Sequence, residues 1–134
     1  MAGKIIADTL EHSTAGSIAT NYVVNGSAKY WTRFDPQTNT EYDSFNQSSR
    51  TDDGVGLCTV SFTNSFNNAY HAGTMDNSSG STPNTGSGAN VHSVYGQTTS
   101  VTQLAYGYSG SAGGTCWYLN DYYNQKAVIH GDLA

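Results

Sequence analysis

Charged side chains are scarce in this sequence. Asp, Glu, Lys and Arg make up 11% of the 134 residues, five residues are basic, and the formal net charge is −5. A nucleic-acid-binding protein needs a basic surface that displaces counterions from phosphates. The composition therefore argues against nucleic acid, and equally against an anionic membrane surface, as a partner. The polar surface has to come from Ser, Thr, Asn, Gln and Gly instead.

Long hydrophobic runs and prolines are scarce as well. No apolar stretch approaches the roughly 20 residues that a membrane span requires, and Ile5-Ile6 is too short for the apolar region of a secretory signal. The sequence has two prolines but ten tyrosines. Disordered chains have few aromatics and high charge, so we expect a folded domain. Because Tyr, Thr and Val favour strands, we expect that domain to be all-β.

Cysteine and histidine form no metal motif. Cys58 and Cys116 lie far apart in the sequence, whereas zinc sites need Cys and His at close spacing. We interpret both cysteines as buried thiols, and a disulfide between them stays open because its geometry cannot be read from sequence. The histidines occur singly, at His12, His71, His92 and His130. The sequence therefore predicts no metal site and no cofactor.

Catalytic motifs are missing too. No Ser lies in a G-x-S-x-G turn, and the two glutamates, Glu11 and Glu41, match no glycosidase pattern. Asp52-Asp53-Gly54 suits a hairpin turn better than a calcium loop, because calcium takes six to eight oxygen ligands from several positions. We therefore expect no enzymatic activity.

Alternating patterns predict a series of short strands. The clearest covers residues 57–62, where Cys58, Val60 and Phe62 would face one side of a half-buried strand. Residues 29–34 carry aromatics on both faces, as in a strand covered by another layer or by a partner chain. Residues 51–56 contain Asp-Gly and predict a hairpin turn. Further strands are expected at 41–45, 69–74, 91–97, 99–108, 115–119 and 126–130.

These strands predict the fold and its division. About seven or eight short strands separated by turns are typical of an antiparallel β-sandwich, here jelly-roll-like. We assign the sandwich to residues 22–134, with residues 22–24 as a strand end and Asn25-Gly26 as a turn. Residues 1–21 have little periodicity and are interpreted as an extended N-terminal arm that packs on another chain or docks the domain elsewhere, with a frayed terminus as the alternative. Residues 76–90 are small and polar and predict a long exposed loop.

Aromatic residues gather in the last third of the chain. They are Tyr106, Tyr108, Trp117, Tyr118, Tyr122 and Tyr123. Aromatic rings stack on sugar rings, and Tyr and Trp bring large contact area at little entropic cost. One interpretation is a glycan- or partner-binding tip at Trp117, Tyr118, Tyr122 and Tyr123. The other is that the members lying in strands are core or interface residues.

Four blocks of sequence carry a resemblance to a known family. They are GKIIADTLEHSTAGS at 3–17, VVNGSAKYWTRF at 23–34, DSFNQSSRTDDGVGLCTVSFTNSF at 43–66 and HGDLA at 130–134. Together they resemble small bacteriophage virion proteins and tail-fibre-type modules, frequent in marine and cyanobacterial phages. Ala28 and Trp31 match a small residue and a Trp in the family's first strand. Cys58 departs from the pattern, which usually has an aromatic residue there, and Gln47 stands where an apolar residue is common.

The resemblance implies a structural virion component that is displayed on the particle surface as a homotrimer. Its partners would be copies of itself and other virion proteins of the capsid or tail. Under this hypothesis the trimer interface would use Tyr30, Trp31 and Phe34, and the anchoring arm would use Lys4, Ile5, Ile6 and Leu10. A capsid decoration protein is slightly favoured over a fibre tip, because a whole fibre needs a long shaft and an adaptor. The alternative function is a carbohydrate-binding module that recognises host surface glycans.

Overall fold

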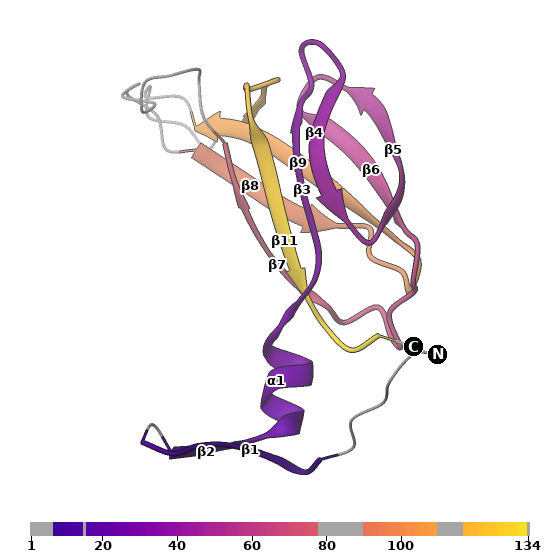
Figure 1. The fold of residues 1–134 in the computed structure, drawn as a ribbon. Coiled ribbons are helices and arrows are strands. Elements are labelled where there is room, and N and C mark those ends of the chain that lie inside the picture. Colours follow the sequence, from indigo (N-terminus) through magenta and orange to yellow (C-terminus); the bar gives the residue numbers. More distant parts are fainter. Residues whose placement is uncertain (1–6, 15, 78–89, 110–116, 134) are drawn as a thin grey trace.

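Two antiparallel β-sheets pack face to face in this protein (Figure 1). The structure is a computed structural model that describes residues 7–14, 16–77, 90–109 and 117–133. It confirms the predicted all-β antiparallel sandwich. A small hairpin and one short helix precede the sandwich in the chain. The interior of the predicted 76–90 loop lies outside the described residues.

The first sheet has four strands in the order β4–β3–β11–β7, each antiparallel to its neighbours. Its strands are β3 (Ala28–Asp35), β4 (Thr40–Phe45), β7 (Ala72–Asp76) and β11 (Gln125–His130). Alternation along β3 places Tyr30, Thr32 and Phe34 inside the sandwich, where all three are buried. Trp31 and Arg33 therefore lie on the outer face of this sheet.

The second sheet has five strands and is organised around β9. Its strands are β5 (Gln47–Gly54), β6 (Leu57–Phe62), β8 (Asn90–Tyr95), β9 (Val101–Ser109) and β10 (Trp117–Leu119). β9 pairs with β8 and with β6, and β10 pairs with β9 beyond the end of β6. Gly56 allows this junction: its φ is +68°, and a Cβ there would lie 2.4 Å from the carbonyl oxygen of Tyr106. The Tyr106 N–H donates to the Gly56 carbonyl at 2.8 Å.

The core lies between the two sheets. Its buried members are Tyr30, Phe34, Cys58, Val60, Phe62, Phe66, Leu104, Tyr106, Ala127 and Ile129. The alternation predicted for residues 57–62 is confirmed, because Cys58, Val60 and Phe62 are buried while the residues between them are half-buried. Cys58 is a free thiol, and burial raises its pKa to about 12, so it stays protonated and behaves as a small apolar residue. Cys116 lies outside the described residues.

The turn predicted at residues 51–56 is shorter in the structure. β5 continues to Gly54, and residues 55–56 form the turn. β5 lies at an edge of its sheet, and its side chains are exposed or half-buried. It therefore has no hydrophobic period, which is the pattern by which strands are found in sequence.

The start of the chain differs most from the sequence expectation. Where an extended arm was expected, β1 (Thr9–His12) and β2 (Gly16–Ala19) form an antiparallel hairpin. Instead of a strand end and a turn, residues 20–26 form α1 (Thr20–Gly26), which crosses the boundary that was predicted after residue 21. We call residues 8–26 the hairpin–helix segment. It lies at one end of the sandwich, beyond the start of β3 (Figure 1).

Candidate functional site

The hairpin–helix segment exposes apolar side chains. Exposed fractions lie between 41% and 67% for Leu10, Ile18, Tyr22, Val23 and Val24. α1 is described throughout and has no buried residue. Its link to the sandwich is polar, since His130 Nδ1 lies 3.1 Å from the carbonyl oxygen of Gly26. The segment therefore presents an uncovered apolar surface.

Local forces alone do not account for this segment. A seven-residue helix is marginal in water because nucleation is unfavourable and few hydrogen bonds repay it. An isolated two-stranded hairpin is also marginal at best. Within the chain, the Thr20 N–H donates to the Asp8 carbonyl at 2.9 Å, and the Thr20 hydroxyl donates to the Ala7 carbonyl at 2.7 Å. These bonds join the helix to the hairpin but cover none of the apolar side chains, so the segment is a candidate contact surface.

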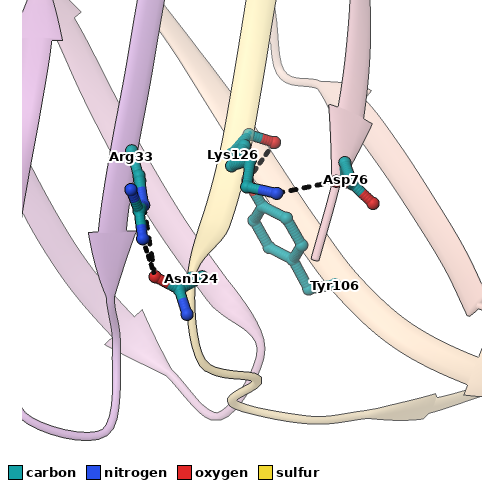
Figure 2. Close-up of polar contacts among 5 residues, drawn as sticks. All are labelled: Arg33, Asp76, Tyr106, Asn124 and Lys126. Atoms are coloured by element: carbon teal, nitrogen blue, oxygen red, sulfur yellow. Dashed lines mark hydrogen bonds and ion pairs between the residues drawn. The ribbon is translucent and has the colours of Figure 1, made fainter. Parts of the chain in front are cut away.

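A second candidate surface lies on the outer face of the four-stranded sheet (Figure 2). Arg33 donates from Nε and Nη2 to Asn124 Oδ1, at 3.2 and 2.7 Å. Lys126 Nζ lies 2.9 Å from Asp76 Oδ2, and both side chains are exposed. These residues come from β3, β11, β7 and the turn before β11, which the sheet brings together from distant parts of the sequence.

Arg33 is held in one orientation. Asn124 has a φ of +52°, a left-handed conformation that Asn tolerates better than most residues, and it ends the turn that leads into β11. On the other side, the guanidinium carbon of Arg33 lies 5.0 Å from the centroid of the Tyr42 ring, within the range of a cation–π contact. Arg33 is thus fixed between an amide and an aromatic ring.

Aromatic residues adjoin Arg33 on the same face. Trp31 is half-buried and is paired in register with Phe45 on β4 and Val128 on β11. Phe45 and Tyr42 are each about half exposed, at 49% and 50%. We call Trp31, Tyr42 and Phe45 the aromatic strip. A groove of about 310 Å³ lies over the neighbouring strands, lined by Thr74, Met75, Asp76, Lys126, Ala127 and Val128.

Tyr106 lies beneath this face rather than on it (Figure 2). Its ring is fully buried, and its hydroxyl donates to the Lys126 carbonyl oxygen at 3.2 Å. Burial raises the pKa of Tyr106 well above its usual range, so the phenol remains neutral. Of the two readings of the late aromatic residues, the core interpretation applies to Tyr106.

The residues of the predicted glycan-binding tip differ in their exposure. Tyr122 is buried, with 8% of its surface exposed, whereas Tyr118 and Tyr123 are exposed. Tyr118 stacks on Tyr108, with ring centroids 5.2 Å apart and 24° between planes. β10 includes Trp117, whose side chain lies outside the described part. The tip therefore retains Tyr118 and Tyr123 as accessible rings, and Tyr122 contributes to packing instead.

The loop that carries Tyr122 and Tyr123 is fastened to its neighbours. Asp121 Oδ1 accepts from the Gly56 N–H at 2.7 Å, and the Asp121 carbonyl accepts from Gln37 Nε2 at 2.8 Å. These contacts tie the loop to the β5–β6 turn and to the β3–β4 loop. The exposed ring of Tyr123 is thus carried on a fixed backbone.

The residues expected at a trimer interface also differ in burial. Tyr30 and Phe34 are fully buried in the core of their own chain, so their side chains cannot reach a second copy in this fold. Trp31 lies on the outer face. Of the residues expected to anchor the arm, Leu10 is exposed on β1, and Lys4, Ile5 and Ile6 lie outside the described residues.

The acidic pair considered for calcium has local partners. Asp52 Oδ1 accepts from the Gly54 N–H at 2.9 Å, and Asp53 Oδ2 accepts from the Thr59 hydroxyl at 2.5 Å. In the described parts of the chain, no three His, Cys, Asp or Glu side chains gather as metal ligands would. α1, the helix found in those same residues, is far too short to span a membrane.

His71 occupies an apolar position beside the core. Its ring stacks on Phe66 with centroids 4.6 Å apart and meets Phe62 edge-on at 5.7 Å. Desolvation lowers the pKa of His71, and the weaker effect of the Asn68 backbone, which raises it, does not compensate. His71 therefore acts as an aromatic packing element.

Comparison with known proteins adds no assignment. No known protein family, curated protein or solved structure matches this chain.

The outer face of the four-stranded sheet was not predicted as a site from the sequence. The alternation of β3 indicated that Trp31 and Arg33 share a face, but Asn124 lies 91 residues from Arg33, so this contact is decided by the pairing of β3 with β11.

Proposed function

We propose that this chain is a structural component of a larger protein assembly: a bacteriophage virion protein displayed as a homotrimer of sandwich domains. The observation that carries the proposal is the hairpin–helix segment. Its helix has no buried residue, and five of its large apolar side chains are exposed. The resemblance to phage virion proteins supports the same view, because two of its blocks, at 3–17 and 23–34, include most of this segment.

An apolar protein surface fits this segment better than a charged partner does. Obligate interfaces resemble a domain core cut in half and are rich in apolar side chains. Fully burying a large apolar side chain that was exposed to water contributes about 1.5–3 kcal/mol. The five side chains are 41% to 67% exposed, so covering their remaining surface favours association. The segment lies at one end of the sandwich (Figure 1), so a contact there leaves the two sheets free to be displayed.

The contact between copies is assigned to this segment. Two of the three residues expected at a trimer interface, Tyr30 and Phe34, belong to the core of their own chain. The hairpin–helix segment supplies the apolar area that β3 cannot. In this arrangement the assembly contact orders the segment, and the sandwich folds around its own core.

Light scattering on the full chain tests the proposal. We expect the mass of three chains for the natural sequence and a smaller mass for Tyr22→Ser combined with Val24→Ser, because these changes remove apolar area from the contact. The control is Tyr70→Ser, which alters a 93% exposed residue of the sandwich and should leave the mass unchanged. A natural chain that is monomeric at all concentrations would contradict the homotrimer, and an unaltered trimer in the double variant would contradict the role of the segment.

A carbohydrate-binding module is the second candidate function. It is favoured by exposed aromatic side chains next to polar groups, which occur at the aromatic strip and again at Tyr118 and Tyr123. The two functions are compatible, because the assembly contact and these surfaces use different residues. A displayed domain that binds host glycans would combine them.

A further inference from the structure

A row of four charged residues crosses the outer face of the four-stranded sheet, with an acid at each end and two bases between them. Asp43, Arg33, Lys126 and Asp76 are paired in register on β4, β3, β11 and β7. We call them the charged row. Neighbouring strands lie about 4.8 Å apart, so the row is roughly 14 Å long. Two acids and two bases leave it with no net charge, so neither a polyanion nor a polycation gains from binding along it.

Much of the hydrogen-bonding capacity of this row is available to a ligand. Arg33 directs two of its nitrogens to one neutral oxygen, that of Asn124, and forms no ion pair within the described residues. The ion pair of Lys126 with Asp76 is exposed, and exposed pairs contribute little to stability, so a ligand can displace it readily. One oxygen of Asp43 accepts from the Ser44 N–H at 2.9 Å. The row therefore offers two neighbouring donors at its centre and an acceptor at each end.

The aromatic strip lies directly beside this row. Trp31 lies two residues before Arg33 on β3, and Phe45 lies two residues after Asp43 on β4, which places both rings on the face of the charged row. Tyr42 adjoins the row through its contact with Arg33. An aromatic face carries negative charge density, which attracts the weakly positive C–H groups on one side of a pyranose ring.

We propose that this outer face binds an uncharged saccharide. A sugar ring lies on the aromatic strip, and its hydroxyl groups, each both donor and acceptor, bond to the central bases and the outer acids of the charged row. The balanced charge of the row complements a neutral ligand, and an apolar platform with a few placed polar groups is the usual composition of a small-ligand site. The groove over Thr74 and Val128 continues this surface towards β7 and gives room for a further part of the ligand.

A protein partner is less well matched to this face. A stable protein interface buries about 800 Å² on each side and has an apolar centre with few charges. Here the apolar side chains form one strip, and four charged side chains stand next to it. The saccharide site uses none of the residues of the hairpin–helix segment. It therefore stands or falls independently of the assembly role.

The experiment uses the full chain on an array of immobilised neutral and uronic-acid-containing oligosaccharides, followed by calorimetric titration of the best neutral oligosaccharide. We expect binding to a neutral sugar. We expect Phe45→Ala and Arg33→Gln each to weaken it at least tenfold. Both residues are exposed on the sheet, so these variants should keep the fold, which circular dichroism and thermal unfolding will verify. The matched control is Tyr70→Ala, an aromatic residue that is 93% exposed and lies outside both candidate sites, which should bind as the natural chain does. Tyr118→Ala, in the predicted tip on the other sheet, distinguishes the two placements of the sugar.

Three results would overturn the proposal. The first is that no neutral oligosaccharide is retained on the array. The second is a preference for the uronic-acid sugars, which would contradict the charge argument. The third is a loss of binding in Tyr118→Ala with none in Phe45→Ala, which would place the site at the predicted tip. None of these results depends on the oligomeric mass, so failure here is separate from failure of the assembly role.

Discussion

The sandwich and the hairpin–helix segment use similar residues in opposite ways. In the sandwich, Leu104 and Ile129 are fully buried between two sheets. In the segment, Leu10 and Ile18 are exposed on a two-stranded hairpin. The same side-chain types therefore stabilise the fold in one region and remain available for contact in the other. Apolar content alone does not distinguish a core from an interface; what distinguishes them is whether a second layer of the same chain covers the residue.

The sandwich and the hairpin–helix segment also differ in the contacts that order them. Within the described residues from 28 to 133, strands distant in sequence pair with one another, such as β3 with β11. The hairpin–helix segment has local pairing only, with β1 on β2 and α1 next in sequence. Since helices and hairpins of this size are marginal alone, we expect the segment to gain its stability from assembly.

Truncation of a matched pair of leucines gives the largest expected contrast. Leu104→Ala should lower the free energy of unfolding by about 2–5 kcal/mol, because it opens a cavity in the core. Leu10→Ala should change it by no more than about 0.5 kcal/mol in a dilute, dissociated chain. Urea unfolding at several protein concentrations measures both. If Leu10 lies in the assembly contact, the effect of its variant should grow with protein concentration, whereas the effect at Leu104 should not.

Alanine at two glycines should give the next largest effect. Gly56→Ala should destabilise the sandwich by roughly 1–3 kcal/mol, because the residue has a positive φ and the added Cβ would meet the Tyr106 carbonyl. Gly26→Ala is the control in the segment: nothing lies within 4 Å of its added Cβ, and Ala favours a helix over Gly by up to about 1 kcal/mol. Thermal unfolding should show a loss for the first variant and none for the second. Equal losses would contradict the contrast between the regions.

A smaller effect is expected from pH. Because burial lowers the pKa of His71 in the folded state, the unfolded chain binds more protons below the ordinary value of 6.5. Stability should therefore fall as the pH drops below about 6.5. His71→Phe keeps the ring contact with Phe66 and should flatten this dependence in urea unfolding at a series of pH values. Burial also lowers the pKa of His92, so a residual slope should remain. An unchanged slope in the variant would show that His71 does not contribute.

Several elements were accessible from sequence because their patterns have a direct physical cause. The strand at residues 57–62 was predicted with its bounds and its buried face, since one covered side requires a period of two. β5 was missed because an edge strand with exposed side chains has no such period. α1 was missed because none of its residues is buried, so it has no apolar stripe, and its two valines favour strands.

The candidate sites, too, were only partly predictable from the sequence. Residue type suggested one aromatic group at Tyr118, Tyr122 and Tyr123 and left open whether its members form a tip or a core. The structure exposes Tyr118 and Tyr123 and buries Tyr122, because burial depends on which elements fold over a loop. The charged row could not be found from sequence, since its four members come from strands that become neighbours only in the sheet.

By itself, the sequence determined that this chain folds as an antiparallel β-sandwich, and it indicated which strand faces meet in the core. Those properties depend on local alternation and on the amount of apolar surface, which follow from the order and the types of the residues. Only the tertiary structure decided that the start of the chain is an uncovered hairpin and helix. It also decided that Arg33, Asn124 and Lys126 share one surface. The reason is that strand pairing brings distant residues together. The entropic cost of closing a loop grows only slowly with its length, so a strand can pair with a near or a distant strand, and the local sequence does not specify which one.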